Sequence, residues 1–266
     1  MAHRSTPVTL AAIAAGVLVL ASSAAAQKAG DTAKAEKVRD RALAKVEAWR
    51  AQPAENILDK DREAVGDTSP FATADAVLQA QNALGKDSKV IDTSLKTLAD
   101  QAKADAANPV PEYYRGMVLV WTGKNDQATA AFKAAESRAR KAVEASSDDA
   151  VAQFYLAASL IRQKKGFDAA RKALDAAAQN GFDRSMVEFQ RGLSFLLQED
   201  WQTAKDAFDA VEKLEPRYAH LYFYRAMAWD KLKRTDMLLN DLDQFVKLAP
   251  NAPEAKTAKA ILASAK

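Results

Sequence analysis

Cysteine is absent from all 266 residues of this sequence. That absence excludes thiol catalysis, zinc sites built from cysteine and iron–sulfur clusters. Histidine is almost absent, because His3 lies in the first residues and only His220 follows. A histidine metal pair or a Ser-His-Asp triad would have to use His220, and no nucleophile-elbow sequence accompanies it. We therefore expect a non-enzymatic protein with no catalytic residue, no metal and no cofactor.

Long apolar runs are also lacking, except for one near the start of the chain. The run from Leu10 to Ala21 follows the positive charge of Arg4 and precedes Ala24-Ala25-Ala26, the small-residue pattern that signal peptidase recognises. We expect residues 1–26 to be a signal peptide that is cleaved before Gln27. Export follows, with the periplasm of a Gram-negative bacterium as the expected compartment. The alternative is an uncleaved anchor, although the run is shorter than the roughly 20 residues of a membrane span.

Charge of one sign is not in excess. The formal net charge is +3, and it falls to +2 when the signal, which carries Arg4 and no acidic residue, is removed. A nucleic-acid-binding protein is expected to carry a basic face, so we predict no nucleic-acid partner. No apolar run after residue 26 is long enough for a membrane span, so none is predicted after cleavage.

Residues 27–69 contain an amphipathic segment and a linker. The segment 31–52 is predicted to be a helix that Pro53 ends. Spacings of four, four and three residues place its apolar side chains on one stripe: Val38, Ala42, Val46 and Trp49. Such a helix lies on the rest of the fold, forms a short coiled coil or binds a partner. Asp, Gly, Ser and Pro residues between 59 and 70 predict the linker.

Residues 70–108 are predicted to form a degenerate helical pair around Gly85. In its second helix the buried face is expected to contain Val90, Ile91, Leu95 and Leu98. The pair matches poorly the repeat that follows it, so whether it is a true copy of that repeat stays open.

From Pro109 the chain repeats itself. Units of helix, short turn and helix are predicted at 109–142, 151–184, 185–218 and 219–252, and the last three follow at a constant spacing of 34 residues. A fixed period of this length indicates a solenoid. The first helices carry small residues at mid-length, and the second helices carry large ones: Gly116, Ala158, Gly192 and Ala226, then Phe132, Leu174, Phe208 and Leu242. Small residues let two helix backbones approach closely, and the large residues fill the remaining gap.

Three kinds of stretch recur in these units. The first helices contain Tyr113-Tyr114-Arg115-Gly116 and Phe189-Gln190-Arg191-Gly192, the turn contains Asp200-Trp201-Gln202-Thr203-Ala204, and the units close on Leu214-Glu215-Pro216 and Leu248-Ala249-Pro250. These stretches resemble the tetratricopeptide repeat over residues 109–252. The fourth unit departs from it, with Leu238 at the position where the second helices of the other units carry Ala128, Ala170 and Ala204. Eight extra residues after the first unit are expected to lengthen its second helix. The resemblance implies an all-α fold, a right-handed superhelical solenoid of helix-turn-helix repeats with an N-terminal helical extension and a capping helix at 253–266.

The resemblance also implies a concave wall lined by the first helices. Residues at the slots that face this groove are predicted to bind a peptide or helix of a protein partner: Tyr113, Met117, Tyr155, Met186, Phe189, Leu193, His220, Phe223 and Met227. Aromatic anchors and adaptable Met side chains suit an apolar peptide or helix face. Alternatively, these side chains pack between helices and never meet a partner. The Lys and Asn residues with which one subtype grips a terminal carboxylate are absent, so that mode of binding is not expected.

Arginine recurs just before the small residue, at Arg115, Arg191 and Arg225. These arginines form either an anion track or ordinary repeat sequence with a solvated head group, and the second interpretation is favoured. The whole pattern predicts an exported scaffold for protein–protein interaction. Two other functions stay open. A carboxylate-dependent hydrolase acting on cell-wall or carbohydrate material would show a closed pocket with convergent acids, and a structural oligomer would pair through residues 31–52.

Overall fold

The computed structural model of the chain describes residues 72–265. The predicted signal peptide, the amphipathic segment 31–52 and the linker lie outside these residues. The described part contains eleven helices and no strand. None of these helices is both long and apolar enough to cross a bilayer.

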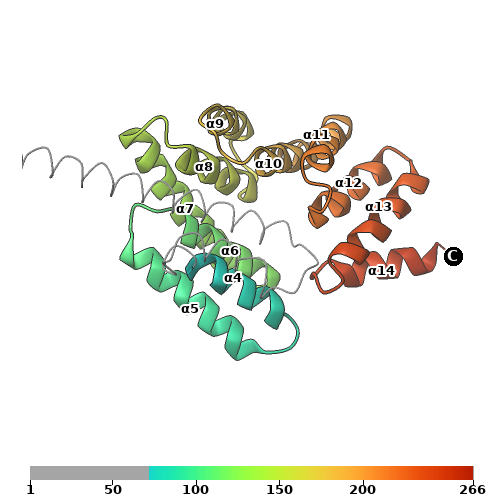
Figure 1. Cartoon of the computed structure of the whole chain (residues 1–266), viewed down its shortest axis with the longest axis horizontal. Coiled ribbons are helices and arrows are strands. Elements are labelled where there is room, and N and C mark those ends of the chain that lie inside the picture. Colours follow the sequence, from blue (N-terminus) through green and yellow to red (C-terminus); the bar gives the residue numbers. More distant parts are fainter. Residues whose placement is uncertain (1–71, 266) are drawn as a thin grey trace, which may run out of the picture.

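The helices follow one another as antiparallel pairs around an arc (Figure 1). The pair in residues 70–108 consists of α4 (Ala72–Ala83) and α5 (Ser88–Ala104). The four repeat units hold α6 (Val110–Trp121) with α7 (Asn125–Ala145), α8 (Ala150–Arg162) with α9 (Phe167–Gln179), α10 (Arg184–Leu197) with α11 (Trp201–Leu214), and α12 (Ala219–Lys231) with α13 (Thr235–Leu248). The last helix is α14 (Ala255–Ser264).

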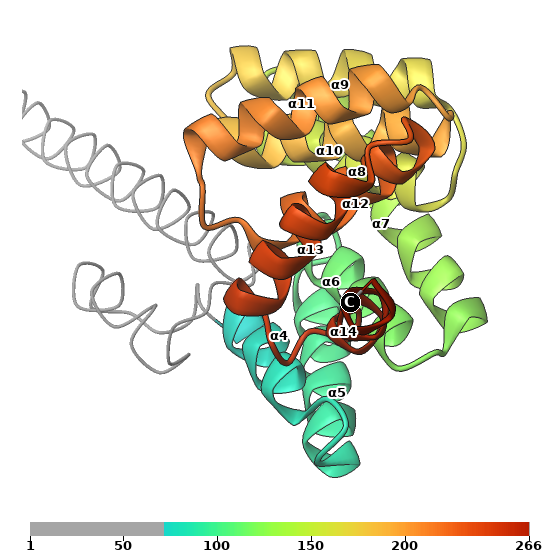
Figure 2. The ribbon, with the colours of Figure 1, turned by 90° about the vertical axis from the view of Figure 1, so that its right-hand side faces the viewer.

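The two helices of each unit belong to different layers. The first helices contact one another along the chain, α6 with α8, α8 with α10 and α10 with α12, and most of their residues are buried. The second helices bury a narrow stripe, which in α11 is Ala204, Phe208 and Val211. An amphipathic helix with a single apolar stripe can cover only one neighbouring surface. The first helices therefore form the inner wall of the solenoid and the second helices its outer wall, as Figure 2 shows for α9 and α11 over α10.

The predicted match between small and large residues is confirmed. A Cβ atom added at Gly116 would lie 2.5 Å from the Phe132 ring, and one added at Gly192 would lie 2.5 Å from the Phe208 ring. The two units that carry alanine in this slot, Ala158 and Ala226, carry leucine in place of phenylalanine. The volume of the large residue is therefore adjusted to that of the small one within each unit.

Local signals explain where helices begin. The carboxylates of Asp87, Asp149, Asp183 and Asp200 accept hydrogen bonds from backbone N–H groups in the first turns of α5, α8, α10 and α11. The eight extra residues after the first unit do lengthen α7, which has 21 residues against 13 or 14 in α9, α11 and α13. From α7, Arg138 donates hydrogen bonds to the carbonyl groups of Ala102 and Asp105, which ties the end of α5 to the first unit.

The helix predicted at the C-terminus is present as α14. Ala255 and Ala258 are buried and Leu262 is half-buried, so this stripe covers the end of the stack. Ile261 does not belong to this stripe, and its side chain is 37% exposed. The reason is helical geometry, because Ile261 lies about a quarter of a turn away from the centre of that stripe.

Candidate functional site

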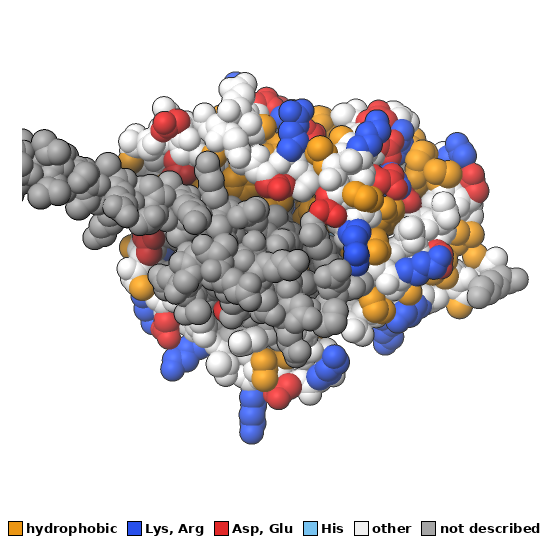
Figure 3. Space-filling model, viewed as in Figure 1, with side chains coloured by type: hydrophobic (Ala, Val, Ile, Leu, Met, Phe, Trp, Pro, Cys, Tyr) orange, Lys and Arg blue, Asp and Glu red, His pale blue; other side chains and the backbone are white. Residues whose placement is uncertain are grey.

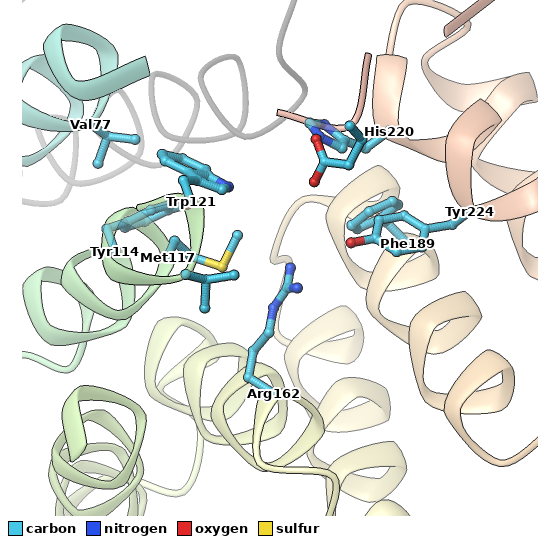
Figure 4. A pocket seen from close by; sticks show the side chains of 10 residues that line it. Val77, Tyr114, Met117, Trp121, Arg162, Phe189, His220 and Tyr224 are labelled. Carbon is cyan, nitrogen blue, oxygen red and sulfur yellow. The ribbon is translucent and has the colours of Figure 1, made fainter. Parts of the chain in front are cut away.

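The inner faces of the helices converge on a small cavity, which we call the central pocket (Figure 4). Its volume is about 50 Å³, and its lining consists of Val77, Tyr114, Met117, Val120, Trp121, Arg162, Phe189, His220, Tyr224 and Glu254. Val77 belongs to α4, and Glu254 directly precedes α14. The arc therefore curves enough to bring residues from both ends of the described chain to one pocket.

Three polar side chains lie among the apolar lining of the central pocket. Nε2 of His220 lies 3.4 Å from Oε2 of Glu254, which joins α12 to the residue before α14. The Arg162 side chain extends from the end of α8 toward this pair, between Met117 and Phe189 (Figure 4). Burial raises the pKa of Glu254, but the hydrogen bond with His220 and the positive charges of His220 and Arg162 together outweigh it. The pKa of Glu254 therefore lies below the ordinary value of 4.5.

We expect the contribution of Glu254 to stability to depend on pH. Because its pKa is lowered in the folded state, the carboxylate stabilises the fold above about pH 4.5, and this stabilisation is lost as the pH falls through the folded-state pKa. Glu254→Gln should lower the free energy of unfolding by about 1 kcal/mol at pH 7 and by less than that at pH 3. Urea unfolding at the two pH values measures this, with the exposed Asp230→Asn as a control. Equal losses at both pH values would contradict the assignment.

The pocket does not provide the acid pair that the hydrolase hypothesis requires. Glu254 is the one carboxylate among the described residues that line it, whereas glycoside hydrolysis by acid and base or nucleophile needs two. Within residues 72–265 no group of three metal-ligating side chains comes together either. The arrangement is suited to holding an apolar group beside one positive and one negative charge.

No family model matches the chain, and no curated protein matches it. Among solved structures, the chain is similar to TTC0263, a thermophilic TPR protein from Thermus thermophilus. The TM-score is 0.52 and the identity 17%, over 73% of this chain and 98% of that one. Looser likenesses are to YrrB, described as a TPR protein with an unusual peptide-binding site, and to MamA. YrrB gives a TM-score of 0.41 and 19% identity over 77% of this chain and 100% of that one. MamA gives a TM-score of 0.40 and 17% identity over 71% and 95%.

The paired helices, the 34-residue period and the likeness to TTC0263 agree. This chain has the tetratricopeptide-repeat fold. The fold class predicted from the sequence, an all-α solenoid, is thereby confirmed.

The burial of the predicted groove residues corrects the expectation that they form an open binding surface. Most of the predicted groove residues are buried in the described structure: Tyr113 at 0% exposure, Tyr155 and Met186 at 1%, Phe189 at 2%, Leu193 at 4%, and Met117 and His220 at 8%. Phe223 is half-buried, and Met227 is 45% exposed. Tyr113, Tyr155, Met186 and Leu193 are therefore core residues and not an open surface. Of the nine, Met117, Phe189 and His220 line the central pocket.

Ring packing between helices explains this burial. The Tyr113 ring centre lies 5.2 Å from that of Tyr155 in α8 and 5.7 Å from that of Phe132 in α7. Phe189 stacks on Tyr218 with a centre-to-centre distance of 4.5 Å. Aromatic pairs at these distances stabilise the contact between repeats. The alternative stated for these residues, packing between helices, is the one that the structure shows for Tyr113 and Tyr155.

Seven pocket residues were not predicted from the sequence: Val77, Tyr114, Val120, Trp121, Arg162, Tyr224 and Glu254. Helical spacing could have indicated several of them, because Trp121 follows Met117 by four residues and Arg162 follows Tyr155 by seven. Glu254 lies beyond the last repeat and reaches the pocket only through the curvature of the arc.

The recurring arginines do not form an anion track. Arg115 pairs with Glu112 at 2.9 Å, Arg191 pairs with Asp175 of the preceding helix, and Arg225 pairs with Asp241 of the following helix at 2.8 Å. Their charges are thus matched by carboxylates of the same or a neighbouring helix. Arg225 also departs from the expected solvated head group, because the residue is only 6% exposed.

Proposed function

We propose that this protein is a non-enzymatic scaffold of the periplasm that binds a peptide or helix of a protein partner along its inner wall. The tetratricopeptide-repeat fold supports a role in recognition, since stacked repeats create an extended concave surface. The location is supported by the signal-like sequence of residues 1–26. The absence of a carboxylate pair from the described lining of the central pocket argues for binding over hydrolysis.

The observation that carries this proposal is the position of the exposed apolar side chains. Five large hydrophobic residues are exposed in the described part of the chain, and three of them lie on first helices: Val120, Leu197 and Met227. Val120 lines the central pocket itself. Met227 follows His220 and Tyr224 at helical spacing, and Leu197 follows Phe189 by eight residues, so both continue the faces that line the pocket. We call Val120, Leu197 and Met227 the inner stripe.

Exposed apolar side chains on the concave side of a solenoid are a candidate interaction site. Met side chains adapt to different apolar partners, and an amphipathic helix binds such a surface through residues spaced three and four apart. Figure 3 shows hydrophobic, basic and acidic side chains intermixed on the right of this face of the molecule, which is the pattern of a solvated face. The inner wall is the better candidate for the binding surface.

The test is a photoreactive residue placed at Met227 and cross-linked in living cells. Phe189 is unsuitable as a probe position, because it is 2% exposed, whereas Met227 is 45% exposed. We expect one dominant protein adduct from Met227, reduced at least ~10-fold by Leu197→Asp, because a buried charge at the interface costs about 2 kcal/mol or more. Leu214, on the outer helix α11 and 51% exposed, is the matched control position. The same adduct from Leu214, or none from Met227, would contradict binding on the inner wall.

A further inference from the structure

The first described helix, α4, lies at the central pocket. Thr73, Ala74 and Val77 of α4 are buried, and Val77 lines the pocket. The part of the chain that precedes Ala72 is therefore connected to a helix that lies at the pocket. After cleavage at the predicted site, residues 27–71 would precede α4, which is a length of 45 residues.

The preceding part of the chain contains an apolar stripe of the kind that the inner wall would bind. Val38, Ala42, Val46 and Trp49 recur at helical spacing within the segment 31–52. From Val38 to Trp49 such a stripe would extend about 16 Å along a helix. Recognition of a helix in an apolar groove uses anchors at this spacing, and a tryptophan is among the side chains that contribute most to such contacts.

We propose that the segment 31–52 is an occupant of the inner wall, with its Val38–Trp49 stripe covering Val120 and the mouth of the central pocket. The inference rests on the proposed function in one respect, namely that the inner wall is a binding surface. It adds that the same chain provides a competitor for that surface. A partner must then displace the segment, so its apparent affinity is reduced by the fraction of molecules in which the wall is already covered.

The length of the connection favours this intramolecular occupant over a second copy. Residues 53–71 connect the segment to α4. A random coil of this length would have an end-to-end distance of about 24 Å. Such a connection gives the segment an effective concentration on the order of 1 mM at the inner wall. If the segment alone bound with a dissociation constant of about 0.1 mM, the wall would be covered in roughly nine molecules out of ten. A second copy at micromolar concentration cannot compete with this.

The first experiment places a photoreactive residue at Trp49 in the purified mature chain. We expect cross-links to α6, α8, α10 or α12 of the same molecule. A probe at Glu47 is the matched control, because helical spacing predicts that Glu47 faces away from the Val38–Trp49 stripe, and it should give at least ~5-fold less of these products. A mixture of ¹⁴N- and ¹⁵N-labelled chains separates the outcomes. Cross-links between chains would assign the wall to a second copy and overturn the proposal, as would equal yields from Glu47 or products only on the outer helices.

The second experiment measures access to the inner wall and uses the absence of cysteine from the chain. Val120→Cys provides one thiol on the wall, and Thr129→Cys provides a control thiol on the exposed side of α7. Adding Val46→Asp and Trp49→Asp should speed maleimide labelling at position 120 about 10-fold and leave position 129 unchanged. An unchanged rate at position 120 would overturn the proposal. Photo-cross-linking of a partner to a probe at Met227 is a separate measurement. It tests the proposed function independently of this result.

Discussion

Replacing Arg225 by methionine is expected to lower the free energy of unfolding by about 3–5 kcal/mol. The guanidinium donates two hydrogen bonds of 2.8 Å to Asp241, and it also donates to Asp209 at 2.7 Å and to Glu212 at 2.6 Å. Only 8% of the Arg225 side chain and 5% of the Asp241 side chain are exposed. Arg225→Met leaves Asp241 buried without its cation, and that uncompensated charge is the source of the loss.

The pKa shifts of this cluster agree with one cation shared by three carboxylates. Burial opposes the charge of Arg225, but hydrogen bonds to Asp241 and Glu212 outweigh it and raise its pKa. Burial raises the pKa of Asp241, although Arg225 lowers it, and the negative charges of Glu212 and Asp209 raise it further. A carboxyl group whose folded-state pKa is raised above the ordinary 3.8 destabilises the fold as the pH rises through that range. The deficit of Arg225→Met should therefore become smaller when the pH is lowered from 7 to 4.

The chain offers a matched control at the same repeat position. Arg191 precedes Gly192 as Arg225 precedes Ala226, and it pairs with Asp175 and, at 3.6 Å, with Glu188. However, 27% of the Arg191 side chain and 56% of the Asp175 side chain are exposed. Arg191→Met is expected to cost no more than about 1 kcal/mol, because exposed ion pairs contribute little. Urea unfolding of both variants followed by circular dichroism measures the difference. Equal losses would show that burial of the Arg225 cluster has no special energetic role.

Replacing both members of the buried pair distinguishes a lost attraction from an uncompensated charge. In Arg225→Met with Asp241→Leu, no buried carboxylate is left without a partner, while the half-exposed Asp209 and Glu212 remain close to water. Such replacements are often neutral. We expect the double variant to recover most of the stability that Arg225→Met loses. A double variant as unstable as the single one would contradict this account.

The internal repeat made the architecture predictable, because each helix pair follows the same local rules. The contact of Gly116 with Phe132 recurs at Gly192 with Phe208, and both could be inferred from residue volume and spacing alone. The same is true of the longer α7 and of the terminal helix α14. These features depend on neighbours close in the sequence, and the sequence carries that information directly.

The candidate site was harder to predict because it depends on the curvature of the whole arc. Tyr113 and Tyr114 are adjacent in the sequence, yet Tyr114 lines the central pocket and Tyr113 packs between helices. The rotation of α6 about its axis determines which of the two tyrosines faces the pocket. That rotation is set by the contacts of Tyr113 with Tyr155 and Phe132 on other helices. Glu254 meets His220 across 34 residues, and no local pattern marks that meeting. A groove position that is assigned from the sequence of a single repeat leaves out the contacts that several repeats form together.

Gly192→Ala is expected to lower the free energy of unfolding by about 1–2 kcal/mol, although alanine is the better helix former by about 1 kcal/mol. The added Cβ would lie 2.5 Å from Cε1 and 2.7 Å from Cζ of Phe208, and Phe208 is fully buried, so its ring has no free space into which to move. Phe208→Leu alone should cost a similar amount, because it leaves a gap beside the glycine.

The combination Gly192→Ala with Phe208→Leu reproduces the residues found at Ala158 with Leu174 and at Ala226 with Leu242. We therefore expect the double variant to be almost as stable as the natural chain, which corresponds to a coupling of about 2–3 kcal/mol between the two sites. The reciprocal exchange, Ala158→Gly with Leu174→Phe, should show a coupling of the same sign in the second unit. Urea unfolding of the four members of each cycle provides the measurement. Two residues that fill a shared gap must be coupled in their effects on stability. Additive losses in both cycles would therefore contradict the conclusion that close packing pairs glycine with phenylalanine and alanine with leucine in this solenoid.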